Sequence, residues 1–331
     1  MRITSGMMRR NYMNNLGSTL GGLAKSRQQV ETGRKFLQSY EDPASAAKAS
    51  VLRMRYARNA ENIETAKNTQ KWQDNQEDAL RQLSDIATEI DKNYSVQGVD
   101  DTKGEEGRKA LAQSLRELQQ SMVASLNAKY GNAYVLAGND GQNPPFELKD
   151  GKVLYRGLDV NDPDNKEALE KLSKETSYID LGFGLKFDEN GGIISSSAFD
   201  SAFPGINAVG FGQNKNGENQ NLISLAGEMA DLLEEEDFDH EGYGKLWESF
   251  NEGSNKLKDQ LATIGSRSKF LETTVDRLET EKINITEEID GTINIDAAEA
   301  ITNFSWASYV YNSALKVGTS VLTPSLLDFL K

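Results

Sequence analysis

Residues 257–289 place apolar side chains at alternating spacings of four and three, and this pattern constrains the fold more than any other feature of the sequence. Two of the ten positions, Ser268 and Lys282, are polar. Such spacing keeps one narrow apolar stripe on one side of an α-helix, and that stripe packs against a partner helix. A long helix in a helical bundle is therefore predicted. The apolar positions are Leu257, Leu261, Ile264, Leu271, Val275, Leu278, Ile285 and Ile289.

The first 35 residues predict a second helix of the same kind. Its stripe also alternates spacings of three and four, with Arg27 as one interruption. Gly33, within "TGRK", ends the helix because glycine after a basic last turn is typical of a helix C-terminus. The predicted stripe consists of Met13, Leu16, Leu20, Leu23 and Val30.

A last helix is predicted from "NIDAAEAITNF" onward. Asp296 and Glu299 are acidic residues where the positive end of a helix dipole favours them. The apolar stripe again alternates spacings of three and four, through Ile301, Phe304, Ser308, Tyr311, Leu315, Gly318 and Leu322. Because the two ends of the chain carry matching stripes, we expect their helices to lie together.

Two further helices are predicted between residues 43 and 129. Asp42 and Pro43 are suited to the N-cap and the first position of a helix that runs to about Tyr94, and a third helix covers about 105–129. The stripe of the first of these helices is apolar late and polar early. Its apolar positions are Leu80, Leu83, Ala87 and Ile90, and its polar ones are Asn59, Asn62, Thr69, Gln73 and Gln76.

Residues 138–218 interrupt the helical pattern. Glycine and aromatic residues become frequent there, and "KVLYRG" and "YIDLGFGLKF" read as short strands bounded by turn residues. The fold class that we predict is mainly α with a β-rich insert, in which both chain ends build a long antiparallel helical-bundle or coiled-coil rod beside one outer β domain. The predicted divisions are a terminal assembly domain (1–39 and 296–331), a helical core (40–137 and 219–295) and the insert (138–218).

Composition argues against catalysis and against a metal site. The chain has no cysteine and one histidine, His240, within an acidic stretch that reads as a solvated linker. Residues 159–170 match a calcium loop at three positions, but Pro163 and Asp164 occupy the fifth and sixth, where the turn requires glycine at the sixth. We therefore expect no enzyme, no cofactor and no bound metal, and an ordinary acidic turn at 159–170.

Charge is unevenly distributed along the 331 residues. Residues 1–58 carry a net charge of +8, and the remainder carries −22. Nucleic-acid binding by the arginines near Tyr56 is one interpretation, but no nucleic-acid-binding motif surrounds them. The favoured interpretation is that the basic segment complements acidic surface on the same or a neighbouring chain. The arginines are Arg53, Arg55 and Arg58.

The apolar C-terminal tail does not predict a membrane anchor. Only eleven uncharged residues, Pro324 among them, separate Lys316 from Asp328, whereas a spanning helix needs about 20 apolar residues. The first thirty residues also lack the apolar run of a cleaved secretory signal. We expect the tail to pack against protein, through Leu322, Leu326, Leu327, Phe329 and Leu330.

Several motifs together resemble the flagellin superfamily of bacterial flagellar axial proteins. They are "MRITSGMM" at the start, "TGRKFLQSYEDPASAAKAS" after the first helix, "IGSRSKFLETTVDRLE" before "DAAEAITNF", and "ALKVGTSVLTPSLLDFLK" at the end. The opening, the ending and "YVLAGNDGQNPPF" are more similar to the branch at the hook–filament junction than to filament flagellins. The insert departs from the family and carries no family residues.

This resemblance implies a structural subunit that joins hook to filament and self-assembles into a ring or tube through its terminal helices. It further implies type III export without a cleaved signal, an extracellular location, and contacts with an export chaperone, the hook-side junction protein and flagellin. A filament flagellin is the alternative within the family. A secreted coiled-coil adhesin is the alternative from another class, although an adhesin has no need for apolar stripes at both chain ends.

Overall fold

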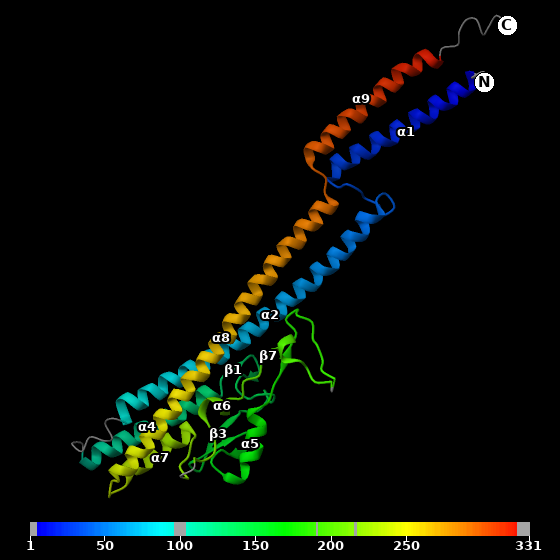
Figure 1. The fold of residues 1–331 in the computed structure, drawn as a ribbon. Helices are drawn as coiled ribbons and strands as arrows, with labels where there is room; N and C mark the ends of the chain where they lie inside the picture. Colours follow the sequence, from blue (N-terminus) through cyan, green and yellow to red (C-terminus); the bar gives the residue numbers. More distant parts are fainter. Residues whose placement is uncertain (1–4, 96–103, 190, 215–216, 323–331) are drawn as a thin grey trace, which may run out of the picture. The chain divides into compact units, whose positions relative to one another are not determined.

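The computed structural model describes residues 5–95, 104–189, 191–214 and 217–322 (Figure 1). The chain forms two compact units. Unit 1 comprises residues 1–60 and 280–331, and unit 2 comprises residues 61–279. Unit 1 is thus built from the two ends of the chain, whereas unit 2 is one continuous segment.

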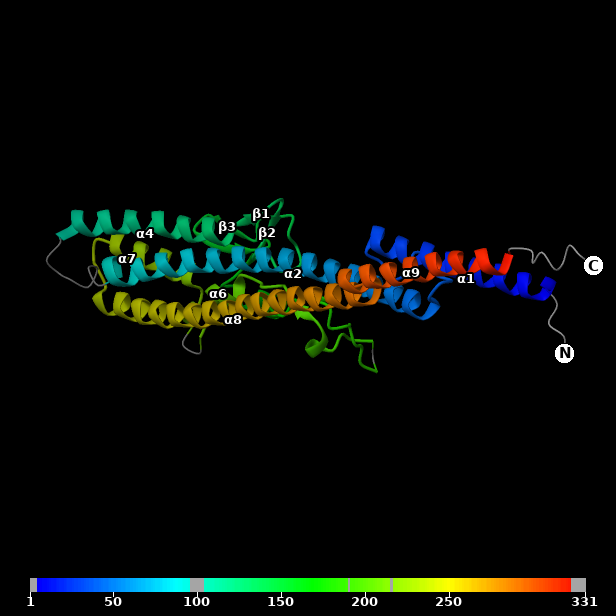
Figure 2. The same ribbon diagram turned by 90° about the horizontal axis from the view of Figure 1, so that it is seen from above.

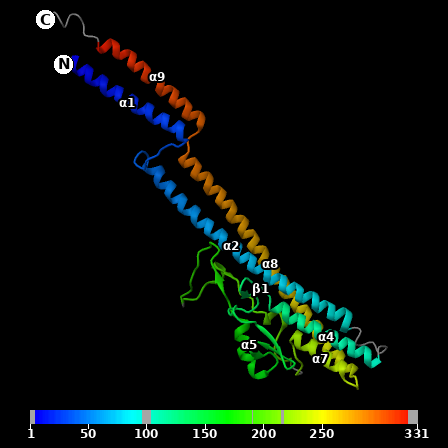
Figure 3. The same ribbon diagram turned by 180° about the vertical axis from the view of Figure 1, so that it is seen from behind.

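Unit 1 contains two complete helices, α1 (Ser5–Thr32) and α9 (Ala297–Leu322), which lie side by side in Figures 1, 2 and 3. It also holds the first part of α2 (Pro43–Glu89) and the last part of α8 (His240–Ile293). The predicted start of α2 is confirmed, since Pro43 is its first residue and the Asp42 carboxylate accepts a hydrogen bond from the Ser45 N–H at 3.0 Å. Hydrogen bonds from Ser45 lower the pKa of the Asp42 carboxyl group.

The helices of unit 2 are the remainder of α2 and α8 together with α4 (Gly104–Leu126) and α7 (Leu222–Glu234). A π-helical turn, η1 (Ile90–Ser95), extends α2 close to the predicted end at Tyr94. α7 begins where Asn221 accepts hydrogen bonds from the N–H groups of Ile223 and Ser224, both at 3.1 Å. α4 and α7 pack against each other along their lengths.

The strands of unit 2 form three small antiparallel sheets within the described part of the insert and its flanks. β1 (Lys129–Tyr130) pairs with β2 (Ala133–Tyr134), and β3 (Phe146–Lys149) pairs with β4 (Lys152–Tyr155). β4 also pairs with β5 (Leu158–Asp159). The third sheet joins β6 (Tyr178–Ile179) to β7 (Phe199–Asp200). The predicted strand in "KVLYRG" is confirmed as β4.

Short helical segments connect these strands. A 3₁₀ turn, η3 (Pro163–Asn165), leads into α5 (Lys166–Ser173), and Asp162 caps η3 by accepting from the Asp164 N–H at 3.0 Å. A second 3₁₀ turn, η4 (Ser195–Ser197), precedes β7, and α6 (Ile206–Val209) follows it. The acidic stretch at 159–170 is therefore a capped turn and a helix start.

One apolar core joins the helices of unit 2 to the β3–β5 sheet. It includes Leu83 from α2, Leu115 from α4, Phe146 from β3, Met229 from α7 and Phe250 from α8, all fully buried. The Phe146 and Tyr155 rings lie 4.9 Å apart across the β3–β4 pair. A smaller cluster around Ala66, Leu181 and Leu271 packs the β6–β7 region onto α2 and α8.

Most of the polar part of the α2 stripe is buried, although Asn62 is only half-buried. Within unit 2, Gln73 and Gln76 are fully buried and Thr69 nearly so. Gln76 donates hydrogen bonds to the carbonyls of Val135 at 2.8 Å and Ser201 at 3.2 Å, which tie α2 to the insert. Neither polar atom of the Gln73 side chain has a hydrogen-bond partner among the described residues.

Two local expectations are wrong. "YIDLGFGLKF" forms a strand only at Tyr178–Ile179, because Gly182 and Gly184 adopt positive φ angles of 89° and 76° and turn the chain away from a strand path. The acidic stretch around His240 is not only a linker, because α8 begins at His240. Asp239 caps that helix by accepting from two N–H groups, and Tyr243 is fully buried.

The predicted mainly α fold with a β-containing insert is confirmed. The division into terminal, core and insert segments stays a prediction, because the boundaries of the two compact units, at residues 60/61 and 279/280, do not test the predicted boundaries.

Candidate assembly surface

The α1–α9 pair presents one inner line of side chains on each helix. On α1 this line recurs at spacings of four and three, and its residues are half-buried: Tyr12, Leu16, Thr19, Leu23 and Ser26. On α9 the matching line contains Ala300, Phe304, Ala307, Tyr311, Ala314 and Gly318. The periodicity of both lines is that of two helices packed along a common seam.

Gly318 and Tyr12 lie in close contact within this pair. A Cβ atom on Gly318 would overlap the hydroxyl of Tyr12. Because glycine leaves this space open, the Tyr12 hydroxyl reaches the Ala314 carbonyl and donates a hydrogen bond to it at 3.0 Å. The contact fixes the register of α1 against α9.

A short backbone bridge closes the other end of the pair. The Lys35 N–H donates to the Ile293 carbonyl at 2.8 Å, and the Ile295 N–H donates to the Gly33 carbonyl at 2.9 Å. Gly33 has a φ of +68°, a conformation that glycine adopts without strain. α9 then starts directly, because Asp296 accepts hydrogen bonds from the N–H groups of two following residues.

The outward faces of α1 and α9 are rich in exposed apolar side chains. Trp306 and Tyr309 are 67% and 64% exposed, and their rings stack with centroids 5.8 Å apart. We call this outward set the outer face of the pair. It consists of Met7, Met13, Leu20, Ile301, Trp306, Tyr309, Leu315 and Val317, whereas Met8 and Val30 are exposed although they continue the spacing of the inner line of α1.

The structure divides the predicted interface residues into two groups. Leu16, Leu23, Phe304 and Tyr311 belong to the inner lines, where they face the partner helix of the same chain. The others with described side chains are exposed. Met13, Leu20, Ile301 and Leu315 lie on the outer face, and Val30 lies at the exposed end of the inner line of α1. Leu322 ends α9, and the predicted positions Leu326, Leu327, Phe329 and Leu330 lie outside the described residues.

Sequence reasoning missed Trp306 and Tyr309. The predicted stripe of the last helix is a single line of apolar positions, and these two residues belong to a second line on the other side of the helix. Their spacing of three, with Val317 further along, was the available signal.

One of the arginines near Tyr56, and Tyr56 itself, contact the neighbouring helix within unit 1. Arg55 lies 3.9 Å from Glu281 of α8, and the Lys282 ammonium lies 5.5 Å from the centre of the Tyr56 ring. Both contacts link α2 to α8. Around them several large apolar side chains are exposed: Leu37, Tyr40, Val51, Met54 and Ile283.

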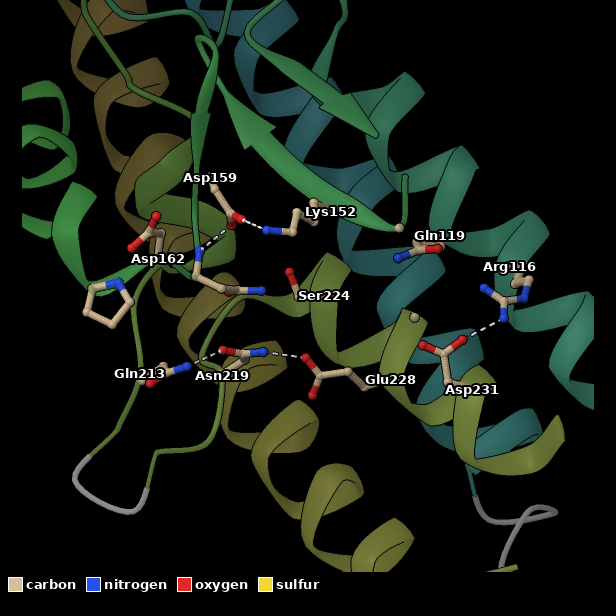
Figure 4. A pocket seen from close by; sticks show the side chains of 14 residues that line it. Arg116, Gln119, Lys152, Asp159, Asp162, Gln213, Asn219, Ser224, Glu228 and Asp231 are labelled. Carbon is tan, nitrogen blue, oxygen red and sulfur yellow. Dashed lines mark hydrogen bonds and ion pairs between the residues drawn. The ribbon is translucent and has the colours of Figure 1, made fainter. Parts of the chain in front are cut away.

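Unit 2 contains a polar cavity of about 420 Å³ (Figure 4). Its charged side chains largely pair with one another, since Arg116 contacts Asp231 at 2.5 Å and Lys152 contacts Asp159 at 3.1 Å. Burial raises the pKa of Glu228, which accepts a hydrogen bond from Asn219. The lining also contains Ser224, whose hydroxyl donates a hydrogen bond to the Asn221 side chain at 3.3 Å.

No cluster of three or more metal-ligating side chains occurs within the described residues. The stretch that matches a calcium loop is occupied by its own contacts, because Asp159 binds Lys152 and also accepts the Asn161 N–H at 3.0 Å. Of the described helices, none is both long and apolar enough to cross a lipid bilayer.

Comparison with known proteins finds flagellar relatives. Residues 3–140 match the family model of the bacterial flagellin N-terminal helical region. This part of the chain is therefore similar to flagellins. One relative is the flagellar hook-associated protein 3 of Escherichia coli (strain K12), which is 26% identical over 158 residues. The match covers 46% of this chain and 49% of the relative, so the chain spans about half the length of that relative.

Solved structures of flagellar proteins resemble this chain to different degrees. A putative flagellar hook-associated protein from Vibrio parahaemolyticus superposes with a TM-score of 0.61 at 12% identity, over 77% of this chain and all of the other. The FlgL structure from Bacillus cereus has a TM-score of 0.49 at 16% identity, over 72% of this chain and 99% of the other. At such identity the Vibrio match shows a shared fold.

Proposed function

We propose that this chain is a structural subunit of the bacterial flagellum that joins the hook to the filament. In this proposal α1 and α9 are the assembly elements, and the chain has no catalytic activity. Residues 1–39 and 296–331 form the terminal assembly domain, and residues 138–218 form the outer insert.

The outer face of the α1–α9 pair is the observation that carries the proposal. A two-helix pair buries one side of each helix, yet here the opposite sides also carry methionine, leucine, tryptophan and tyrosine. Large exposed apolar surfaces mark sites of protein–protein contact. Burying a side chain of this size contributes about 1.5–3 kcal/mol, so repeated contacts between subunits supply the free energy of a stable assembly.

Similarity to known proteins also supports the assignment as a flagellar structural subunit. The matched family region is the N-terminal helical part of flagellins, and the curated relative is a flagellar hook-associated protein. We infer from these names that the partners are further copies of this chain, the hook-side junction protein and flagellin. An export chaperone, the type III export apparatus and an extracellular location in the flagellum complete the proposal.

Filament flagellin is the alternative function, because the matched region is named for flagellins themselves. A strain without this chain distinguishes the two. The junction function predicts hooks without filaments by electron microscopy, together with flagellin monomers released into the medium. Absence of filaments without released flagellin would indicate that this chain is the filament subunit, and normal filaments would contradict both.

Complementation of that strain tests the assembly surface. Trp306→Ser with Tyr309→Ser removes two exposed rings of the outer face without touching the inner line. We expect soluble protein in the medium and few or no filaments. Asn312→Ser, at another exposed position of α9, is the matched control and should restore filaments. Normal filaments from the double variant would show that the outer face is not needed for assembly.

A further inference from the structure

A hairpin of the insert carries an exposed apolar tip. We call residues 182–189 and 191–197 the finger, which loops out of the insert beside β7 in Figures 1 and 3. Phe187 at its tip is 61% exposed, and Leu185 and Ile194 are exposed beside it. Together these three side chains leave an exposed apolar surface at the tip.

Internal hydrogen bonds hold the finger in shape. The Asp188 N–H donates to the Gly192 carbonyl at 2.8 Å, and the Ile194 N–H donates to the Lys186 carbonyl at 2.9 Å. Phe187 and Ile193 form an isolated antiparallel bridge. The tip is therefore a defined hairpin that presents Phe187.

The base of the finger is anchored to the helices of unit 2. Leu181, directly before it, is fully buried. Phe183 lies 6.1 Å from the Phe270 ring of α8, and the Arg277 guanidinium lies 4.9 Å from the Phe183 ring. Gly182 approaches Asn62 of α2 so closely that a Cβ atom would overlap the amide. A fixed base and an exposed tip are the features of a docking element.

Unit 2 also contains an open groove with an aromatic wall. The groove has a volume of about 360 Å³ and lies where α2 meets the β6–β7 sheet. The Trp72 indole and the Ile179 side chain supply its apolar surface. Its lining residues are Thr65, Asn68, Thr69, Trp72, Ile179 and Ser201.

The charges beside the finger tip and beside the groove are complementary. Lys186 and Glu189 flank Phe187, with a separation of at most about 10 Å along an extended chain. On α2, Glu64 and Lys71 flank the groove residue Asn68, and seven helical residues also span about 10 Å. None of these four side chains has an ion-pair partner among the described residues.

We propose that the finger of one copy docks into the groove of a second copy, with Phe187 against Trp72 and Glu189 beside Lys71. Such a contact joins two different surfaces, so it repeats from copy to copy and generates a ring or a helical array. This inference rests on the proposed function, because it assigns one contact within the homo-oligomer. It adds a contact through unit 2 to those of the α1–α9 pair.

A photo-cross-linking residue in place of Phe187 tests the contact directly. Phe187→p-benzoyl-L-phenylalanine keeps an aromatic side chain at the tip. A mixture of ¹⁵N-labelled and unlabelled chains then distinguishes cross-links between copies from those within one copy. We expect mixed-isotope products that map to Asn68 or Trp72 by mass spectrometry. The same label at Lys171, an exposed position of α5, is the control and should not reach these residues.

Charge reversal tests the register. An exposed ion pair contributes about 0.2–1 kcal/mol, so Glu189→Lys should lower the cross-link yield about two- to fivefold, and Lys71→Glu in the partner copy should restore it. Cross-links confined to one chain, or to another protein, overturn the proposal. So does an unchanged yield in the Glu189→Lys variant. A strain that still builds the hook–filament junction without these cross-links contradicts the finger contact alone, whereas normal filaments in the deletion strain contradict the proposed function.

Discussion

Unit 2 buries most of its large apolar side chains, whereas unit 1 leaves many of them exposed. In unit 2, helices and strands bury leucine, phenylalanine and tyrosine side chains in one continuous core. In unit 1, few large side chains are fully buried, and most of the exposed large apolar residues of the described chain lie there. The stability of unit 2 is therefore internal, whereas that of unit 1 depends on what covers its outer face.

This difference in burial follows from the number of elements that pack together in each unit. A pair of isolated helices covers one side of each, and short segments in such pairs are only marginally stable in water. The core of unit 2 is closed by a third and a fourth helix and by a sheet. A chain end with apolar residues on both sides of its helices is suited to a subunit that completes its packing in an assembly.

Core truncation should give the largest difference between the two units. Leu115→Ala in α4 creates a cavity in the core of unit 2 and should lower the free energy of unfolding by about 2–5 kcal/mol. Leu20→Ala, on the outer face, should change it by less than about 0.5 kcal/mol in the monomer. Urea unfolding followed by the fluorescence of Trp72 and Trp247, in a Trp306→Phe background, measures the first effect, because both tryptophans lie in unit 2. Amide hydrogen exchange in α1 and α9 measures the second.

If Leu20→Ala destabilised the monomer as much as Leu115→Ala does, the difference between the two units would be contradicted. That result would show that the outer face is packed without a partner. A loss below about 1 kcal/mol from Leu115→Ala would show that the unit 2 core is loosely packed.

The next largest effect should come from Gly318→Ala in the α1–α9 pair. The added Cβ atom displaces the Tyr12 hydroxyl and its hydrogen bond to Ala314. Overpacking of this kind costs about 1–3 kcal/mol. Amide exchange should accelerate in α1 and α9 and stay unchanged in α4 and α7. Gly17→Ala, where the space is open, is the control and should stabilise α1 by about 0.5–1 kcal/mol.

Sequence periodicity predicted the helices well because their stripes are buried against partners in the same chain. The α8 stripe and the amides of α2 are examples: Leu257, Ile264 and Leu271 are fully buried, as is Gln73. The same reasoning could not place the α1 and α9 stripes correctly. Their apolar residues occupy two sides of each helix, and no pattern in one sequence tells which side faces the chain's own partner.

Local geometry accounts for the other misses. The sequence of the finger resembles a strand because apolar residues alternate at 181, 183, 185 and 187, whereas two glycines with positive φ turn the chain. At the start of α8, the acidic composition suggested a linker. The Asp239 cap and the packing of Phe238 on Tyr243, at 5.5 Å between rings, outweigh that composition.

Substitution of two buried glutamines should distinguish a side-chain amide that has hydrogen-bond partners from one that has none in unit 2. Gln73→Leu replaces a buried amide without described partners, so it should be neutral or stabilise unit 2 by about 1–3 kcal/mol. Gln76→Leu removes two hydrogen bonds and leaves two carbonyls unpaired, so it should destabilise by a similar amount. Thermal melting of the two variants in parallel measures the difference. Equal destabilisation by both would mean that Gln73 has a partner in solution.

The smallest expected effect is the pH dependence of unit 2, where two glutamates of α7 should act with opposite signs. Burial raises the pKa of Glu228, and Arg116 lowers the pKa of Glu234. An unfolded glutamate titrates near about 4.3. Ionised Glu228 therefore destabilises the fold at neutral pH, and this cost disappears as the pH falls through its raised pKa. The stabilisation from Glu234 is present above about pH 4.3 and is lost as the pH falls through its lowered pKa.

Because Glu234 and Arg116 are substantially exposed, solvent screening should keep the Glu234 contribution below about 1 kcal/mol. Urea unfolding between pH 4 and 7 should show that Glu228→Gln gains stability mainly at the neutral end, whereas Glu234→Gln loses it there. In an Arg116→Met background, Glu234→Gln should have no further effect, and a persistent loss would show that Arg116 is not the cause.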